Sequence, residues 1–133
     1  MALEAAASSE RIAGAIAICP AGPDHLLRGL RAGRLEMRID PGARESLEAW
    51  LAEHDQRRAV ELIGSKPLLL IHARGDDQIP SEWSQELYEH AVEPRRLILV
   101  PGGDHRSLQH DAELQSVALG WLEKRLQPGR PTG

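Results

Sequence analysis

Three short apolar runs lie along the chain, and each ends close to a proline or a glycine-containing turn. They are Arg11–Cys19, Leu68–His72 and Leu97–Val100. None alternates apolar with polar residues, and a continuous apolar run is typical of a strand covered on both faces. The pattern therefore predicts three buried β-strands.

Segments with helical periodicity separate these strands. Apolar residues recur there every three or four positions, with polar residues between them. The predicted helices are Leu3–Ser9, Arg44–Ile63 (with Leu47, Trp50, Leu51 and His54 on one face), Ser81–Ala91 (with Ser81 as its N-cap) and Ser107–Leu126. Strands that alternate with helices imply right-handed crossovers and a parallel sheet. The predicted fold class is α/β, a three-stranded parallel sheet with helices on both faces.

Composition narrows the class of protein. The chain has 133 residues, enough for one domain or part of one, and its net charge of −4 offers no basic surface for nucleic acid. No apolar run approaches the roughly 18 residues that cross a bilayer, and the N-terminus lacks a secretory signal. The single cysteine, Cys19, excludes an internal disulfide. We expect a cytoplasmic protein that binds neither nucleic acid nor membrane.

Two residues suited to proton chemistry follow the second and third strands. Asp76 lies in the turn after Leu68–His72, and His105 lies in the turn after Leu97–Val100. Ligands of open parallel sheets bind beyond the carboxyl ends of the strands. A carboxylate that orients a histidine is two thirds of a Ser-His-Asp triad. The alternative is that Asp76 only caps the next helix and His105 is an ordinary loop residue.

Other side chains have simpler interpretations. Cys19 is read as a buried, inert thiol and not as a nucleophile. The serines near helix ends are read as caps or surface residues, and two further aspartates as solvated turn residues. These are Ser8, Ser9, Ser107, Asp77 and Asp104. A metal site assembled from His72, Asp76, Asp77, His105, His110 and Asp111 matches no metal-binding spacing, so we predict none. His110 and Asp111 are placed in the first turn of the last helix.

The two turns resemble those of the α/β-hydrolases. The segment Ile71–Pro80, Ile-His-Ala-Arg-Gly-Asp-Asp-Gln-Ile-Pro, is similar to that family's acid turn, His-Gly-x-x-Asp-x-x-Val-Pro. Aligned on its histidine and final proline, the acid falls on Asp76, and Ala73 replaces the usual glycine. The segment Val100–His105, Val-Pro-Gly-Gly-Asp-His, resembles the family's histidine turn. The resemblance extends over nearly the whole chain, and the order of acid before histidine agrees with it.

The resemblance implies the C-terminal half of an α/β-hydrolase fold that hydrolyses a carboxylic ester or a similar acyl bond. Asp76 would orient His105, the substrate would be a small ester or acyl compound, and no cofactor would be needed. Some members place the acid after the preceding strand, where this chain has Asp24. The family's nucleophile elbow, Gly-x-Ser-x-Gly, is absent, because no serine has glycine at both −2 and +2.

In the family the elbow precedes an alanine-rich helix, which Met1–Ser9 resembles. We therefore expect a truncated product or a fragment of a longer hydrolase, inactive by itself. The alternative is a catalytically inactive remnant that acts as a binding or interaction module. Residues 1–126 would form the partial domain, 21–43 a lid-like insertion or loop, and 127–133 a disordered tail. Without the nucleophile strand beside it, Ile12–Ile18 would be an open edge that supports a homodimer.

Overall fold

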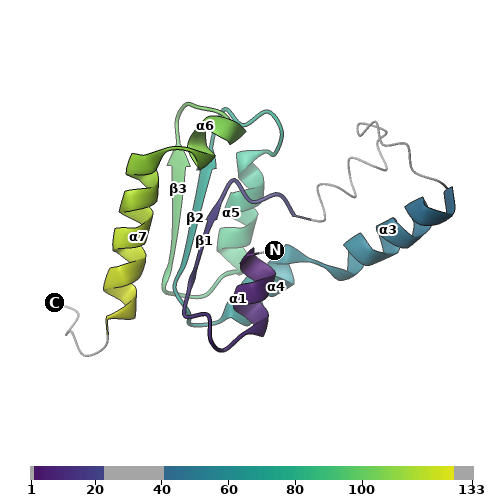
Figure 1. Ribbon diagram of the computed structural model, residues 1–133, viewed down its shortest axis with the longest axis horizontal. Coiled ribbons are helices and arrows are strands. Elements are labelled where there is room, and N and C mark those ends of the chain that lie inside the picture. Colours follow the sequence, from purple (N-terminus) through teal and green to yellow (C-terminus); the bar gives the residue numbers. More distant parts are fainter. Residues whose placement is uncertain (1, 23–40, 128–133) are drawn as a thin grey trace.

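The computed structural model describes residues 2–22 and 41–127, and the helices and strands below lie within them (Figure 1). In chain order they are α1 Ala2–Ser8, β1 Ala15–Ile18, α3 Pro41–Glu53, α4 Gln56–Ile63, β2 Leu68–Ala73, α5 Ser81–His90, β3 Arg95–Val100, α6 His105–Gln109 and α7 Ala112–Leu126.

The three strands form a parallel sheet in the order β1-β2-β3. Ala15 of β1 pairs with Leu68 of β2, and Leu70 of β2 pairs with Leu97 of β3. All six residues of the central strand β2 are buried. The predicted sheet is confirmed, although β1 is shorter than the apolar run Arg11–Cys19 that contains it. Because the strands are parallel, their carboxyl ends meet at one edge of the sheet.

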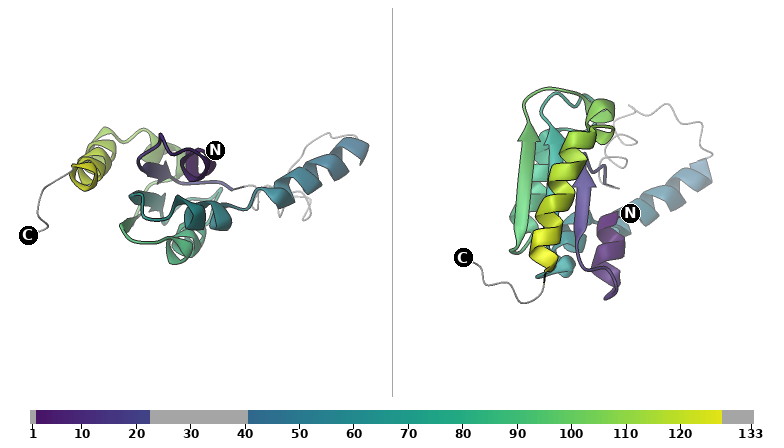
Figure 2. Two further views of the ribbon diagram at one scale, coloured as in Figure 1. Left: turned by 90° about the horizontal axis from the view of Figure 1, so that it is seen from below. Right: turned by 60° about the vertical axis from the view of Figure 1, so that its left-hand side comes forward.

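Helices cover both faces of the sheet, as predicted (Figures 1 and 2). On one face α1, α4 and α5 pack against Leu68 and Leu70 of β2. On the other face α6 and α7 pack against Leu69 and Ile71 of the same strand. Successive β2 side chains therefore supply two separate cores, which explains the continuous apolar run.

A lysine fixes α1 to the rest of the fold. The Lys66 ammonium group, just before β2, donates hydrogen bonds to the carbonyl oxygens of Ala6 at 2.8 Å and Ser9 at 2.7 Å. The last carbonyls of a helix have no partner within the helix and carry partial negative charge. The cation of Lys66 satisfies two carbonyl groups at the end of α1 and so holds this helix beside the sheet.

Two of the predicted helices are each broken into two. Residues 44–63 fall in α3 and α4, because the Asp55 carboxylate accepts the Arg57 N–H at 2.9 Å and starts α4 as its N-cap. The last helix begins earlier than predicted, as α6, and restarts as α7 where Asp111 accepts the Leu114 N–H at 3.1 Å. His110 is the C-cap of α6 and not part of the first turn of α7. A new helix can thus begin at a capping aspartate even where the helical spacing of apolar residues continues without a break.

Helix α3 also departs from its prediction. It extends away from the sheet in Figure 1, and Trp50 is 51% exposed instead of buried on an apolar face. The Trp50 ring stacks on His54 with ring centroids 3.9 Å apart. Helix α3 already includes residues 41–43 of the predicted insertion. The rest of that insertion from residue 23 onward, Asp24 within it, and residues 128–133 of the tail lie outside the described residues.

The start of α5 differs in one detail. Pro80 is its N-cap and makes no side-chain capping bond, so Ser81 is the first helical residue and not the cap.

None of the described helices is both long and apolar enough to cross a bilayer.

Candidate active site

Asp76 and His105 meet at the carboxyl edge of the sheet. Asp76 lies in the turn after β2, and His105 is the first residue of α6, which follows β3. The Asp76 Oδ2 atom lies 2.8 Å from His105 Nδ1, so the predicted contact is confirmed. The side chain of Asp76 is fully buried, and that of His105 is 18% exposed.

The two turns that carry this pair touch through their backbones. A Cβ atom built on Gly75, the residue before Asp76, would lie 2.5 Å from the carbonyl oxygen of Gly103. That distance is far below a van der Waals contact, so no side chain fits at this position. Gly103 has φ of +76°, a left-handed conformation that glycine adopts without steric cost. The glycines therefore set how closely the acid approaches the histidine.

Both carboxylate oxygens of Asp76 have donors. Oδ1 accepts the backbone N–H groups of Gln78 at 2.9 Å and Ile79 at 2.8 Å, while Oδ2 accepts His105 and lies 3.2 Å from His72 Nε2. Burial acts to raise the pKa of Asp76, but the hydrogen bonds from Ile79, His105 and Gln78 outweigh it and hold the pKa below its usual value. Asp76 is therefore ionised at neutral pH.

An ionised carboxylate only accepts hydrogen bonds, so His105 Nδ1 must carry a hydrogen. In the neutral ring the lone pair then lies on Nε2, which is the nitrogen able to take up a proton. The side-chain amide nitrogen of Gln109, one turn along α6, lies 3.3 Å from this Nε2. The pair thus has the tautomer of a general base held by its acid.

A capping box holds His105 at the first position of α6. The Asp104 carboxylate accepts the Ser107 N–H at 2.7 Å, and the Asp104 N–H donates to Ser107 Oγ at 3.0 Å. The backbone hydrogen bond from Ser107 holds the pKa of the exposed Asp104 below its usual value. Asp104 is exposed as expected, but it is also the N-cap that orients the helix, with Ser107 as its partner. These residues position His105 and are not its reacting partners.

Cys19 lies next to the pair, which the sequence analysis did not anticipate. It follows β1, is 1% exposed and has φ of +48°, unusual for a residue other than glycine. One ligand atom from each of Cys19, Asp76 and His105 lies within 4.8 Å of the others. Burial, together with the nearby Asp76 carboxylate, raises the pKa of the Cys19 thiol to about 11. The position of Cys19 could have been predicted, because it directly follows β1 and the three parallel strands end at the same edge of the sheet.

We expect Cys19 to be nearly inert toward thiol reagents. A thiol with a pKa of about 11 is protonated at pH 7.5, and its thiolate fraction is roughly 100-fold or more below that of an ordinary thiol of pKa about 8.5. The rate of reaction with a disulfide reagent such as DTNB measures this in the folded chain. The same chain in guanidinium chloride is the control and should react at the ordinary rate. Equal rates in the two conditions would show that the folded thiol is accessible and has an ordinary pKa, which would contradict the prediction.

Cys19, Asp76 and His105 are also the described residues that could hold a metal ion, since sulfur, oxygen and imidazole nitrogen all suit zinc. A metal would have to compete with the hydrogen bonds that already engage the Asp76 carboxylate. The sequence analysis considered six residues for a metal site. The structure brings three of them together, His72, Asp76 and His105. Asp77 is exposed on the turn, and His110 with Asp111 lies at the junction of α6 and α7.

Several of the described serines take part in local structure. Ser8 Oγ donates to the Ala5 carbonyl at 3.4 Å, and Ser9 Oγ accepts the Arg11 N–H at 3.3 Å, as expected at a helix end. Ser84 contacts His72 within the core. Among residues 2–22 and 41–127, no serine hydroxyl is hydrogen-bonded to His105.

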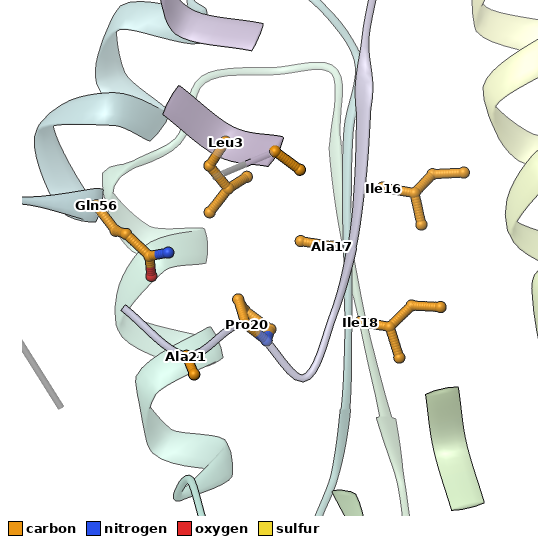
Figure 3. A pocket seen from close by; sticks show the side chains of 8 residues that line it. Leu3, Ile16, Ala17, Ile18, Pro20, Ala21 and Gln56 are labelled. Atoms are coloured by element: carbon orange, nitrogen blue, oxygen red, sulfur yellow. The ribbon is translucent and has the colours of Figure 1, made fainter. Parts of the chain in front are cut away.

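A pocket of about 190 Å³ lies beside β1 (Figure 3), and neither Asp76 nor His105 is among the residues that line it. Leu3 of α1, Gln56 of α4 and Ala17 of β1 line it, with Pro20 and Ala21 at one end. Ile16 and Ile18 of β1 also line the pocket, although their side chains extend to the other side of the strand, where α7 packs (Figure 3). The pocket therefore belongs to the β1 side of the fold and not to the candidate active site.

No model of a known protein family matches the chain. The uncharacterized protein YfhR of Escherichia coli is 56% identical over 39 residues, which make up 29% of this chain and 14% of that protein. YfhR of Salmonella typhi is 38% identical over 48 residues, 36% of this chain and 16% of that protein.

Solved structures cover far more of the chain. The esterase domain of a Rhodothermus marinus protein matches 92% of it with a TM-score of 0.66 at 21% identity. Est1E from Butyrivibrio proteoclasticus matches 93% with a TM-score of 0.63 at 22% identity, and the α/β hydrolase GrgF from Penicillium sp. matches 92% with 0.65 at 20% identity. The chain spans 55%, 54% and 59% of these structures, respectively. The chain therefore has the fold of a partial α/β-hydrolase.

Proposed function

We propose that Asp76 and His105 are the acid and base of a Ser-His-Asp triad that hydrolyses a carboxylic ester or a similar acyl bond. The observation that carries this proposal is the 2.8 Å hydrogen bond between the buried Asp76 carboxylate and His105 Nδ1. It leaves the lone pair of the neutral ring on His105 Nε2, the nitrogen that would exchange the proton and that lies 3.3 Å from the Gln109 amide nitrogen. The esterase folds that the chain resembles support the same class of reaction.

In this mechanism the nucleophile is a serine outside these 133 residues. His105 Nε2 takes the serine proton as the hydroxyl attacks the acyl carbon, and the ring becomes an imidazolium. The ionised Asp76 stabilises that cation through Nδ1–H. His105 then donates the proton to the leaving alcohol, and a water molecule repeats the sequence to release the acid. The small-molecule ester or acyl substrate needs no cofactor in this scheme.

The chain alone is expected to hydrolyse p-nitrophenyl acetate no faster than its His105→Ala variant. An acid and a base without their nucleophile retain little of the contribution of a triad. The rate of p-nitrophenol release from both proteins, at equal concentration, measures this. A burst of product with acylation of a serine or of Cys19 would contradict it and would identify a nucleophile within the chain.

The DNA upstream of the Met1 codon tests the proposal itself. An in-frame Gly-x-Ser-x-Gly sequence there supports the enzyme. In the longer product, Asp76→Asn should then lower kcat by roughly 10⁴-fold, as loss of the correct histidine tautomer does in a serine triad. If the longer product hydrolyses esters equally well with Asp76→Asn, the triad assignment is wrong.

The second candidate is a catalytically inactive remnant that acts as an interaction module. The observation that favours it is the β1 edge, beside which no described strand pairs on the outer side. In this reading two copies associate through Ile12–Ile18 as a homodimer. A ribosome-binding signal directly before Met1, without an upstream elbow, would support the remnant over the enzyme.

A further inference from the structure

His72, the fifth residue of β2, is a polar side chain in the core of the sheet. None of its surface is exposed, and both ring nitrogens have partners. Nδ1 lies 2.7 Å from Ser84 Oγ on α5. Nε2 lies 2.9 Å from the carbonyl oxygen of Ile79 and 3.2 Å from Oδ2 of Asp76. The ring therefore joins α5, the turn after β2 and the candidate catalytic acid.

These partners determine where the ring carries its hydrogen. The carbonyl oxygen of Ile79 can only accept, and so can the ionised carboxylate of Asp76. Nε2 must therefore be an N–H donor, and it donates to the Ile79 carbonyl oxygen with Asp76 Oδ2 close beside it. The Ser84 hydroxyl can donate or accept, so it accommodates Nδ1 whether or not that nitrogen is protonated. The surroundings thus require a hydrogen on Nε2.

Both histidines lie close to the same Asp76 oxygen, and His105 is hydrogen-bonded to it. His105 approaches Oδ2 from the turn after β3 at 2.8 Å, and His72 approaches it from within the sheet at 3.2 Å. Oδ1 is held separately by the backbone N–H groups of Gln78 and Ile79. A carboxylate held at both oxygens cannot rotate about its terminal bond without losing a donor. His72 is bonded to Ile79, whose N–H holds Oδ1, and its ring lies 3.2 Å from Oδ2. It thus restricts the carboxylate that faces His105.

We infer that His72 is a positioning residue for the acid–base pair, acting on His105 through Asp76. This inference rests on the proposed function, because it assigns His72 a role in orienting that pair. If His72 only filled space in the core, its N–H would not affect the His105 ring. If it positions Asp76, the loss of this one donor should change the tautomer of the His105 ring.

The experiment is NMR of the 133-residue chain with ¹⁵N-labelled imidazole rings. In the unaltered chain we expect the hydrogen of His72 on Nε2 and that of His105 on Nδ1. Two variants of similar polarity separate the roles. The amide nitrogen of His72→Gln reaches the place of Nε2 and can still donate to the Ile79 carbonyl beside Asp76, whereas that of His72→Asn reaches only the place of Nδ1. His105 should keep its Nδ1–H tautomer in the glutamine variant and show a mixture of both tautomers in the asparagine variant.

A folded His72→Asn chain in which His105 keeps a pure Nδ1–H tautomer would overturn the inference. So would a folded His72→Gln chain that loses it. The backbone amide spectrum shows whether each variant folds. If His72→Asn does not fold, the tautomer of His72 in the unaltered chain decides, since a hydrogen on Nδ1 with a bare Nε2 is incompatible with donation to Ile79 beside Asp76. Ring tautomers are independent of any nucleophile, so a failure here is distinguishable from an absence of esterase activity.

Discussion

Replacing Gly75 with alanine is expected to lower the free energy of unfolding by about 1–3 kcal/mol and to separate Asp76 from His105. The alanine Cβ would lie 2.5 Å from the backbone carbonyl oxygen of Gly103, and a backbone atom cannot move aside as the end of a flexible side chain can. The two turns must part for the methyl group to fit. His105 then loses its contact with Asp76, even though neither residue has been changed.

Gly102 supplies a matched control in the second of these turns. A Cβ built there meets nothing within 4 Å, so Gly102→Ala should be neutral or slightly stabilising through the unfolded chain. Urea unfolding gives the stability of both variants, and the ¹⁵N signal of the His105 ring reports the contact with Asp76. Equal stability of the two variants, with His105 unchanged, would show that the close approach of the turns is not required.

The second large effect concerns self-association through β1. The N–H groups of Ala15 and Cys19 donate to Pro67 and Ile71 on the β2 side, at 2.9 and 2.7 Å. Alternate residues of a strand direct their backbone groups to the same side, so those of Ile16 and Ile18 point to the outer edge. An apolar edge of this kind is a template for another strand. We expect the chain to be a dimer or larger at tens of micromolar.

Ile16→Lys should shift this association to monomer, because a charge on the edge strand disfavours the approach of a second sheet. Sedimentation velocity at several concentrations measures it. Ile98→Lys is the matched control, since Ile98 is partly buried on the same face of the sheet but lies in β3, at the opposite edge. A compact monomer of the unaltered chain, with rapidly exchanging Ile16 and Ile18 amides, would contradict the prediction.

The sheet and the contact between Asp76 and His105 could be predicted because a strand that is buried on both faces appears in the sequence as a continuous apolar run. The apolar runs of β2 and β3 located two parallel strands, and parallel strands bring the turns after them to one edge. Asp76 and His105 could therefore be paired without knowledge of any side-chain conformation.

The remaining features depend on local competition or on contacts between distant segments. New helices begin at Asp55 and Asp111 although the helical spacing of apolar residues continues through both positions. Each aspartate accepts a backbone N–H of the first helical turn, a group that has no carbonyl partner within its own helix. Cys19 lies beside the pair only because β1 adjoins β2 in the sheet. The polar position His72 inside an apolar run was a visible signal, but its partner Ser84 lies 12 residues further along the chain.

All the hydrogen bonds described for the pair and its supports join residues between His72 and Gln109. That range is a single uninterrupted stretch that holds the end of β2 together with α5, β3 and α6. The elements before it still support the site, because β1 pairs with β2 and helices α1 and α4 pack on one face of that strand. The chain carries both turns without a Gly-x-Ser-x-Gly motif. The two turns alone therefore do not identify a complete triad.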